Sequence, residues 1–148
     1  MADFLSGVGG TFVFSDQPAA LADWYADVFG FQWQAMGDSR YQMFLAADRT
    51  DPTKVLDFHF AIMKAKVPLP PVPAPVPEPT EGDAMYGDQP FMVNVRVTDM
   101  DAALAHARSR GVAVIRTQDE GYGRFAWVRD PDGRRVEIYQ PIPGAFGG

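Results

Sequence analysis

The sequence predicts an α+β fold made of two tandem βαβββ modules, and three observations lead to it. The pattern Asp-x-x-Ala-Ala-Leu-Ala begins at Asp16 and returns at Asp99. Each copy follows a strand-like segment and precedes a helix, a glycine and further strands. A proline-rich stretch separates the two copies. Because one helix covers only one face of a four-stranded sheet, the other face of each sheet must meet a second sheet or a ligand.

The first module is expected over residues 8–64. Residues 8–15 alternate as a strand, with Phe12 and Phe14 on one face. Asp16 is expected to cap a helix that runs to Phe29 and ends at Gly30. Three further strands are expected at 31–36, 40–46 and 54–63.

A linker is expected over residues 65–90. Its part 67–79 holds seven of the thirteen prolines, which excludes a helix or a central strand there. It is expected to form a stiff polyproline II segment roughly 40 Å long. An SH3-type ligand is the less favoured interpretation.

The second module is expected over residues 91–141. After a strand at 91–97, Asp99 caps a helix that runs to Arg110, and a short strand follows at 112–116. The module ends in a hairpin, whose strands 123–129 and 134–140 flank the turn Asp130-Pro131-Asp132-Gly133.

Composition limits the possible functions of the chain. Its 148 residues, 47% of them hydrophobic, suit a single domain with a real core. No apolar run is long enough to span a membrane, and no secretory signal begins the chain, so a cytoplasmic location is expected. The absence of cysteine excludes disulfides and zinc-thiolate sites. A net charge of −6 argues against nucleic acid as a partner.

Strand alternation separates an apolar face, assigned to the helix side, from a mixed polar face. In the last strand Val136 and Ile138 point one way, while Arg135, Glu137 and Tyr139 point the other. The residues expected on the polar faces are Thr11, Val13, Asp57, His59, Asn94, Arg96, Arg135, Glu137 and Tyr139. They line a ligand site, or they simply face water on half-solvated sheets. Trp127 or Tyr139 is expected to stack on a ligand, and Arg96 or Arg135 to pair with Glu137.

Two stretches resemble the vicinal oxygen chelate superfamily, which contains glyoxalases, bleomycin-resistance proteins and extradiol dioxygenases. They are residues 20–31, Ala-Leu-Ala-Asp-Trp-Tyr-Ala-Asp-Val-Phe-Gly-Phe, and residues 130–137, Asp-Pro-Asp-Gly-Arg-Arg-Val-Glu. The resemblance implies curved mixed sheets that enclose one pocket, the glyoxalase/bleomycin-resistance fold. It also implies a homodimer.

The resemblance further implies up to four metal-ligand positions, which fall on Gly9, Asp57, Met92 and Glu137. Gly9 has no side chain, and the Met92 thioether does not suit a hard divalent cation. No cofactor is therefore expected. A divalent metal held by Asp57 and Glu137 is the weaker alternative.

These observations favour a small-molecule-binding protein of this superfamily that lacks the intact metal site. Its expected ligand-binding residues are Asp57, His59, Asn94, Arg96, Trp127, Arg135, Glu137 and Tyr139. The alternative is a glyoxalase-type metal-dependent lyase or isomerase that uses Glu137 with Asp57 or His59, so that Glu137 and His59 are the catalytic candidates. A dimeric scaffold without a ligand is a third possibility.

Overall fold

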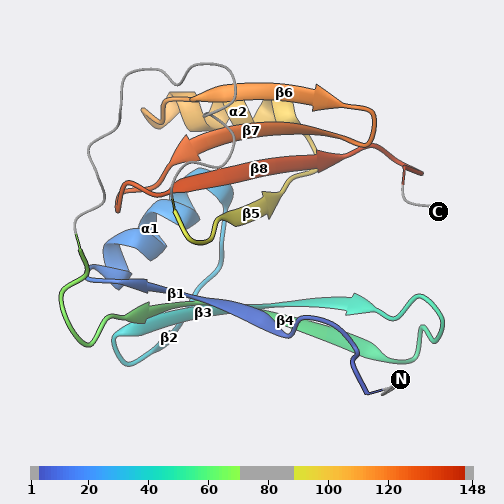
Figure 1. The fold of residues 1–148 in the computed structure, drawn as a ribbon, viewed down its shortest axis with the longest axis horizontal. Coiled ribbons are helices and arrows are strands. Elements are labelled where there is room, and N and C mark those ends of the chain that lie inside the picture. The colour runs from blue at the N-terminus through green and yellow to red at the C-terminus, as the bar shows by residue number, and fades with distance from the viewer. Residues whose placement is uncertain (1–3, 71–88, 146–148) are drawn as a thin grey trace. The chain divides into compact units, whose positions relative to one another are not determined.

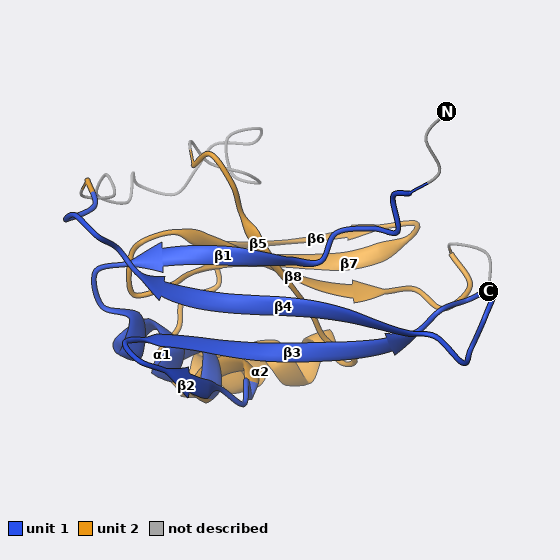
Figure 2. Cartoon of the chain, turned by 90° about the horizontal axis from the view of Figure 1, so that it is seen from below, with its two compact units in different colours: residues 1–26, 30–69 blue, residues 27–29, 70–148 orange. Residues whose placement is uncertain are grey.

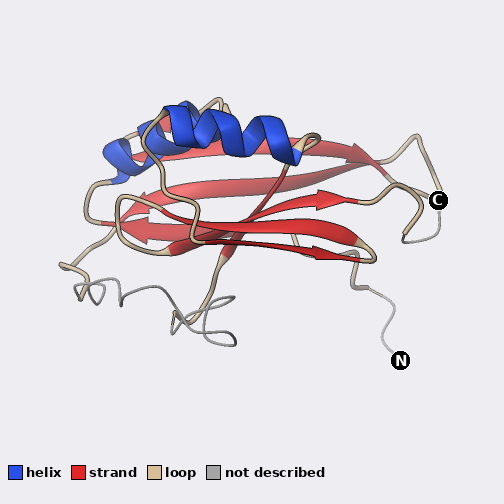
Figure 3. Ribbon diagram, turned by 90° about the horizontal axis from the view of Figure 1, so that it is seen from above, coloured by secondary structure: helices blue, strands red, loops and turns tan. Residues whose placement is uncertain are grey.

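The computed structural model describes residues 4–70 and 89–145 (Figure 1). The chain divides into two compact units, residues 1–26 with 30–69 and residues 27–29 with 70–148 (Figure 2). Each sheet is four-stranded and mixed, and the chain has one helix between the first and second strands of each sheet, which confirms the α+β prediction (Figure 3). Most of the predicted polyproline II segment lies outside the described residues, and the predicted module boundaries stay predictions.

Unit 1 contains the first sheet. Its elements are β1 (Gly10–Ser15), α1 (Pro18–Phe29, whose last three residues cluster with unit 2), β2 (Gln34–Met36), β3 (Ser39–Ala47) and β4 (Val55–Lys64). The strand order is β1-β4-β3-β2, with β1 parallel to β4 and the other pairs antiparallel.

The start of α1 differs from the prediction. Gln17 occupies the cap position and makes no side-chain cap bond. The Asp16 carboxylate instead accepts the backbone N–H of Leu69, with Oδ2 at 3.1 Å from that nitrogen. The predicted cap at Asp16 is therefore wrong, because a contact 53 residues away along the chain takes its carboxylate.

The face assignment of β1 also needs correction. Thr11 and Val13 pair with Phe60 and Ile62 of β4, and directly paired residues lie on the same face of a sheet. Phe60 lies under α1, with its ring centroid 5.4 Å from that of Tyr25. Thr11 and Val13 therefore lie on the helix side and not on the ligand face. Phe12 takes their place on the other face, where it is 60% exposed.

Unit 2 contains the second sheet, which repeats the strand order of the first. Its elements are β5 (Val93–Arg96), α2 (Met100–Ser109), β6 (Arg116–Glu120), β7 (Gly123–Arg129) and β8 (Arg135–Pro141). The order is β5-β8-β7-β6, with β5 parallel to β8.

The short strand predicted at 112–116 is misplaced, because β6 begins at Arg116, where the predicted strand ends. The backbone N–H of Val112 still bonds to Ala107 at the end of α2, and regular pairing begins only at Arg116. Hydrophobicity favoured the Val-Ala-Val-Ile stretch, whereas the tight turn at Gly121-Tyr122 pairs the polar residues 116–120 with β7.

The core of unit 2 lies between α2 and the face of the sheet that carries Val95, Val136 and Ile138, as predicted. These three side chains are buried, together with Met100 and Leu104 of α2. Asp99 caps α2 as predicted, since its Oδ1 accepts the N–H of Ala102 at 3.0 Å. Neither helix in the described part of the chain is long and apolar enough to cross a membrane.

The turn between β7 and β8 confirms the predicted hairpin. Gly133 has φ +84°, a conformation that side chains with a Cβ rarely adopt, and its N–H bonds to the carbonyl oxygen of Asp130 at 2.9 Å. Asp130 Oδ1 also accepts the N–H of Arg134 at 3.0 Å. Pro131 follows at the second turn position. This turn fixes the register that places Glu137 beside Trp127.

Candidate ligand-binding site

Glu137 lies at the centre of the second sheet. It is paired with Asn94 on β5 and with Trp127 on β7, so the three side chains share one face. The Asn94 amide Nδ2 donates to Glu137 Oε2 at 2.5 Å. The face of the sheet opposite α2 is called the Glu137 face below. It carries Asn94, Arg96, Arg116, Gln118, Phe125, Trp127, Arg135, Glu137 and Tyr139.

The sequence predicted that Arg96 or Arg135 would pair with Glu137, but the side-chain amide of Asn94 takes that place. None of the ion pairs among residues 4–70 and 89–145 involves Glu137. Arg96 lies beside Tyr139 and is exposed. Arg135 is only 5% exposed, and the Gln89 side chain bonds to its backbone N–H and carbonyl oxygen at 2.7 and 2.9 Å. The cations thus lie on the same face as Glu137, but an uncharged group holds the carboxylate.

Three rings form a stacked series on the Glu137 face. Tyr139 stacks on Phe125 with centroids 5.1 Å apart, and Phe125 stacks on Trp127 at 6.3 Å. Trp127 is only 1% exposed, so its ring has no open surface on which a ligand could stack. Of the two rings predicted to stack, Tyr139 is the one that is only half-buried.

Gly123 determines how Tyr139 lies. A Cβ at Gly123 would stand 2.5 Å from Tyr139 Cε2 and 3.1 Å from the carbonyl oxygen of Gln140. Such contacts are far inside van der Waals distance, so any side chain at Gly123 would displace the Tyr139 ring. The missing side chain therefore lets the ring lie across β7 and stack on Phe125.

Unit 1 brings together the predicted residues Asp57 and His59. His59 Nε2 lies 2.7 Å from Asp57 Oδ2, and the two side chains are 42% and 58% exposed. On the neighbouring strand β3, Met43 pairs with His59 and Leu45 with Asp57, and both are exposed apolar residues. The result is an imidazole oriented by a carboxylate beside exposed apolar side chains, an arrangement suited to proton transfer.

Of the four positions that the family resemblance assigns to a metal, two offer no hard ligand and two carry carboxylates that already have hydrogen-bond partners. Gly9 and Met92 offer no hard ligand, the Asp57 carboxylate is bonded to His59, and the Glu137 carboxylate is bonded to Asn94. Within the described ranges, no three His, Cys, Asp or Glu residues gather closely enough to hold a metal ion. The metal content of the protein stays a prediction.

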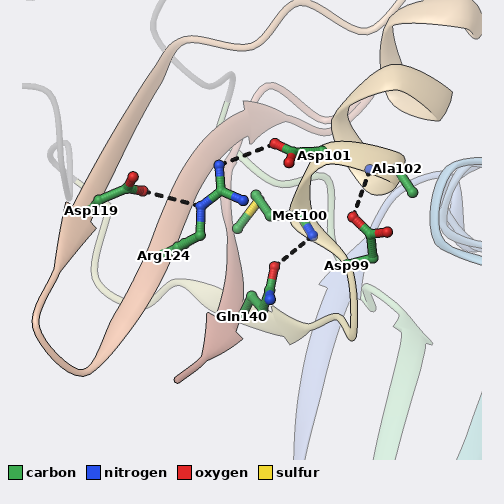
Figure 4. Close-up of polar contacts among 7 residues, drawn as sticks. All are labelled: Asp99, Met100, Asp101, Ala102, Asp119, Arg124 and Gln140. Atoms are coloured by element: carbon green, nitrogen blue, oxygen red, sulfur yellow. Dashed lines mark hydrogen bonds and ion pairs between the residues drawn. The ribbon is translucent and has the colours of Figure 1, made fainter. Parts of the chain in front are cut away.

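A groove that sequence reasoning missed lies beside α2, where residues of α2, β6 and β7 come together. Its volume is about 370 Å³, and it is lined by Met100, Asp101, Leu104, Arg108, Thr117, Gln118, Asp119, Arg124 and Phe125. Arg124 spans it, with Nη2 at 3.0 Å from Asp101 Oδ1 and Nε at 3.3 Å from Asp119 Oδ1 (Figure 4). The hydrogen bond from Arg124 lowers the pKa of Asp101, and the two carboxylates raise that of Arg124. Arg124 therefore links α2 to the β6–β7 hairpin through its contacts with these two carboxylates.

Three residues of the Glu137 face, Arg116, Gln118 and Phe125, were also missed, although the sequence held a signal for one of them. Phe125 lies two positions before Trp127, so the alternation of β7 places both rings on one face. Gln118 had no comparable signal, because its strand was predicted in the wrong place. The groove had none either, since it forms only where α2 packs on the sheet.

Comparisons with known proteins agree with this architecture. Residues 7–138 match the family model described as the Glyoxalase/Bleomycin resistance protein/Dioxygenase superfamily. No curated protein matches the sequence.

Solved structures resemble the whole chain. TnmS3, an antibiotic binding protein from Streptomyces sp. CB03234, is 25% identical, with 95% of this chain and 100% of that chain covered and a TM-score of 0.55. TioX from Micromonospora sp. ML1 is 19% identical, with coverage of 93% and 100% and a TM-score of 0.57. An integron cassette protein of V. cholerae is 14% identical, with coverage of 95% and 98% and a TM-score of 0.61. The last two likenesses concern the fold alone.

Proposed function

The chain belongs to the glyoxalase/bleomycin resistance protein/dioxygenase superfamily, and from this premise we propose that it binds a small polar organic molecule with an aromatic part. The ligand lies on the Glu137 face, and no metal takes part in its binding. The observation that carries this proposal is the Asn94–Glu137 pair, which lies directly beside the stacked rings of Tyr139 and Phe125. A polar anchor next to aromatic surface is the usual composition of a small-molecule site.

The side chains of this face supply complementary contacts. Glu137 uses Oε2 for Asn94, which leaves Oε1 to accept an N–H or O–H of the ligand. The exposed guanidinium of Arg96 donates to a ligand acceptor, and the ring of Tyr139 covers the aromatic part. The likeness to TnmS3, an antibiotic binding protein, supports a binding role.

We extend the proposal to the assembly. The functional protein is a homodimer. The large exposed apolar side chains Phe12, Met43 and Leu45 on the face of unit 1 that carries Asp57 and His59 support the need for a covering surface. Light scattering at protein concentrations of roughly 1 to 100 μM, which span a typical dissociation constant of a dimer, tests whether the protein is a dimer. A monomer throughout that range removes the dimer from the proposal.

The binding role is tested with a panel of substituted bicyclic aromatic compounds, titrated against the wild-type protein, Glu137→Gln and Asp119→Asn. Both substitutions remove one carboxylate from the same sheet, but Asp119 lies on the α2 side. We expect compounds that bind the wild type to lose about tenfold in affinity with Glu137→Gln and to be unaffected by Asp119→Asn. Equal affinities for all three proteins would contradict the placement of the ligand on the Glu137 face.

A second candidate, a lyase or isomerase, is favoured by one observation, the 2.7 Å contact between His59 and Asp57. In this role His59 takes a proton from the substrate while Asp57 orients the ring. The test follows isomerisation of the hemithioacetal of methylglyoxal and glutathione, with and without added Ni²⁺. Turnover that His59→Gln and Glu137→Gln both abolish would favour the enzyme, whereas turnover at the uncatalysed rate removes this reaction.

A further inference from the structure

Two buried polar atoms on the Glu137 face have no hydrogen-bond partner among the described residues. They are the indole Nε1 of Trp127, a donor, and the amide Oε1 of Gln118, an acceptor. Buried polar side-chain atoms are nearly always paired, because an unpaired one has lost its hydrogen bonds to water without replacing them. An unpaired donor and an unpaired acceptor on one face therefore require an explanation.

The sheet register places these two side chains close to each other. Trp127 pairs with Arg116, and Gln118 pairs with Phe125, so Trp127 and Gln118 occupy diagonal positions on the adjacent strands β7 and β6. Diagonal neighbours lie roughly 7 Å apart at Cβ, within reach of one small molecule. Both lie on the same face as Glu137 and Tyr139, the centre of the proposed binding site.

The chemical role of each atom is determined. An indole nitrogen can only donate, so Trp127 requires an acceptor. The Gln118 Nε2 donates to Glu120 Oε1, which identifies the unpaired atom as the carbonyl oxygen, and this oxygen requires a donor.

Trp33, in unit 1, provides an internal comparison. Its Nε1 donates to the carbonyl oxygen of Ala22 at 2.7 Å. The chain thus supplies an intramolecular partner where an indole N–H serves structure alone. Trp127 differs in this respect, and it also lies on the proposed binding face.

We propose that Trp127 and Gln118 together recognise an amide group of the ligand, which makes the ligand class an aromatic amide or lactam. The inference rests on the proposed binding function and deepens it. Both atoms are buried, so the side chains that cover them move aside when the ligand binds. Trp127 Nε1 then donates to the carbonyl oxygen of the ligand, and Gln118 Oε1 accepts its N–H. A single hydroxyl group would have to donate and accept through the same oxygen atom. Trp127 and Gln118 lie on different strands and approach two different atoms of the ligand, as an amide group provides. Trp127 is thereby a hydrogen-bonding residue and not the stacking residue expected from the sequence.

The test uses 2-quinolone, a flat lactam, as the probe, and the indole N–H signals of ¹⁵N-labelled protein as the readout. Two matched compounds remove one function each: 1-methyl-2-quinolone lacks the N–H, and 1,2,3,4-tetrahydroquinoline keeps the N–H and lacks the carbonyl group. We expect 2-quinolone to move the Trp127 indole signal downfield and to leave that of Trp33 unchanged. Tetrahydroquinoline should not cause this downfield shift.

Variants give a second measure. Trp127→Phe keeps a ring and removes the N–H, and Gln118→Met keeps the length of the side chain and removes the acceptor. Each should weaken 2-quinolone binding about tenfold, while Trp33→Phe should leave it unchanged. Gln118→Met should not affect 1-methyl-2-quinolone, which has no N–H to lose. If Trp127→Phe fails to fold, the Gln118→Met comparison still decides the matter.

The outcomes separate this inference from the proposed function. If 2-quinolone binds with an affinity that depends on Glu137 but leaves the Trp127 signal unmoved, the amide inference is overturned and the binding face stands. Preferential binding of tetrahydroquinoline over 2-quinolone has the same meaning. If no compound of any class binds in a Glu137-dependent way, the proposed function fails, and the inference fails with it.

Discussion

Asp130, in the turn between β7 and β8, makes the stability of this protein depend on pH near neutrality. Its side chain is 6% exposed, and burial raises its pKa from 3.8 to about 6. The N–H of Arg134 partly offsets this rise, whereas the nearby charge of Asp132 adds to it. In the unfolded chain the carboxyl returns to its ordinary pKa, so folding favours the protonated form.

The sign of the effect follows from this difference. A group whose pKa is raised by folding contributes stability that is complete below about pH 3.8 and is lost as the pH rises through about 6. A rise of about two pKa units corresponds to about 3 kcal/mol. The free energy of unfolding should therefore fall by about 3 kcal/mol in total as the pH rises from about 3 to about 7, and about half of this fall should lie between pH 5 and pH 8.

Asp130→Asn isolates this contribution. The amide oxygen of Asn can still accept the N–H of Arg134, but the residue no longer titrates. We expect the variant to exceed the wild type in stability at pH 8 by up to about 3 kcal/mol, and this difference to shrink to about half at pH 5. Urea unfolding followed by tryptophan fluorescence measures both proteins at each pH, and Asp119→Asn serves as the exposed control. Parallel profiles for the wild type and Asp130→Asn from pH 5 to pH 8 would refute the reasoning.

Two substitutions and one measurement of metal content test the turn, the position of Tyr139 and the metal site. Gly133→Val forces a β-branched residue into φ +84°, so it should lower the free energy of unfolding by more than about 1 kcal/mol; an unchanged melting temperature would contradict the turn. Gly123→Ala should displace the Tyr139 ring and weaken the binding of aromatic compounds, whereas similar ring-proton shifts of Tyr139 in both proteins would exclude that displacement. The purified protein should carry well under one equivalent of transition metal, and chelator should barely change its stability; metal retained through dialysis would reverse this expectation.

Much of the fold could be predicted because its signals are local. The alternation of Val136 and Ile138 with Glu137 and Tyr139 reports which residues share a face, whatever they pack against. The turn residues Pro131 and Gly133 restrict the backbone by themselves. The repeated pattern at Asp16 and Asp99 correctly indicated two βαβββ units, even though only Asp99 caps its helix.

The errors occur where a distant partner overrides a local preference. The carboxylate of Asp16 is a good helix cap by residue type, but Leu69 takes it. Phe12 is more hydrophobic than Thr11, yet the parallel register between β1 and β4 turns Thr11 and Val13 toward α1. The polar residues 116–120 form a strand because β7 provides a partner for their backbone groups.

Local patterns in the chain were enough to predict the order of the elements, the hairpin turn and the residue types available to a binding face. Which of those residues meet became known only from the folded arrangement. Glu137 bonds to Asn94 and not to an arginine, Gly123 makes room for Tyr139, and Arg124 joins Asp101 to Asp119. The physical reason is that periodicity acts over a few residues, whereas these contacts depend on the pairing and packing of elements. A pattern along the chain can identify a face, but only strand register and helix packing bring particular atoms within bonding distance.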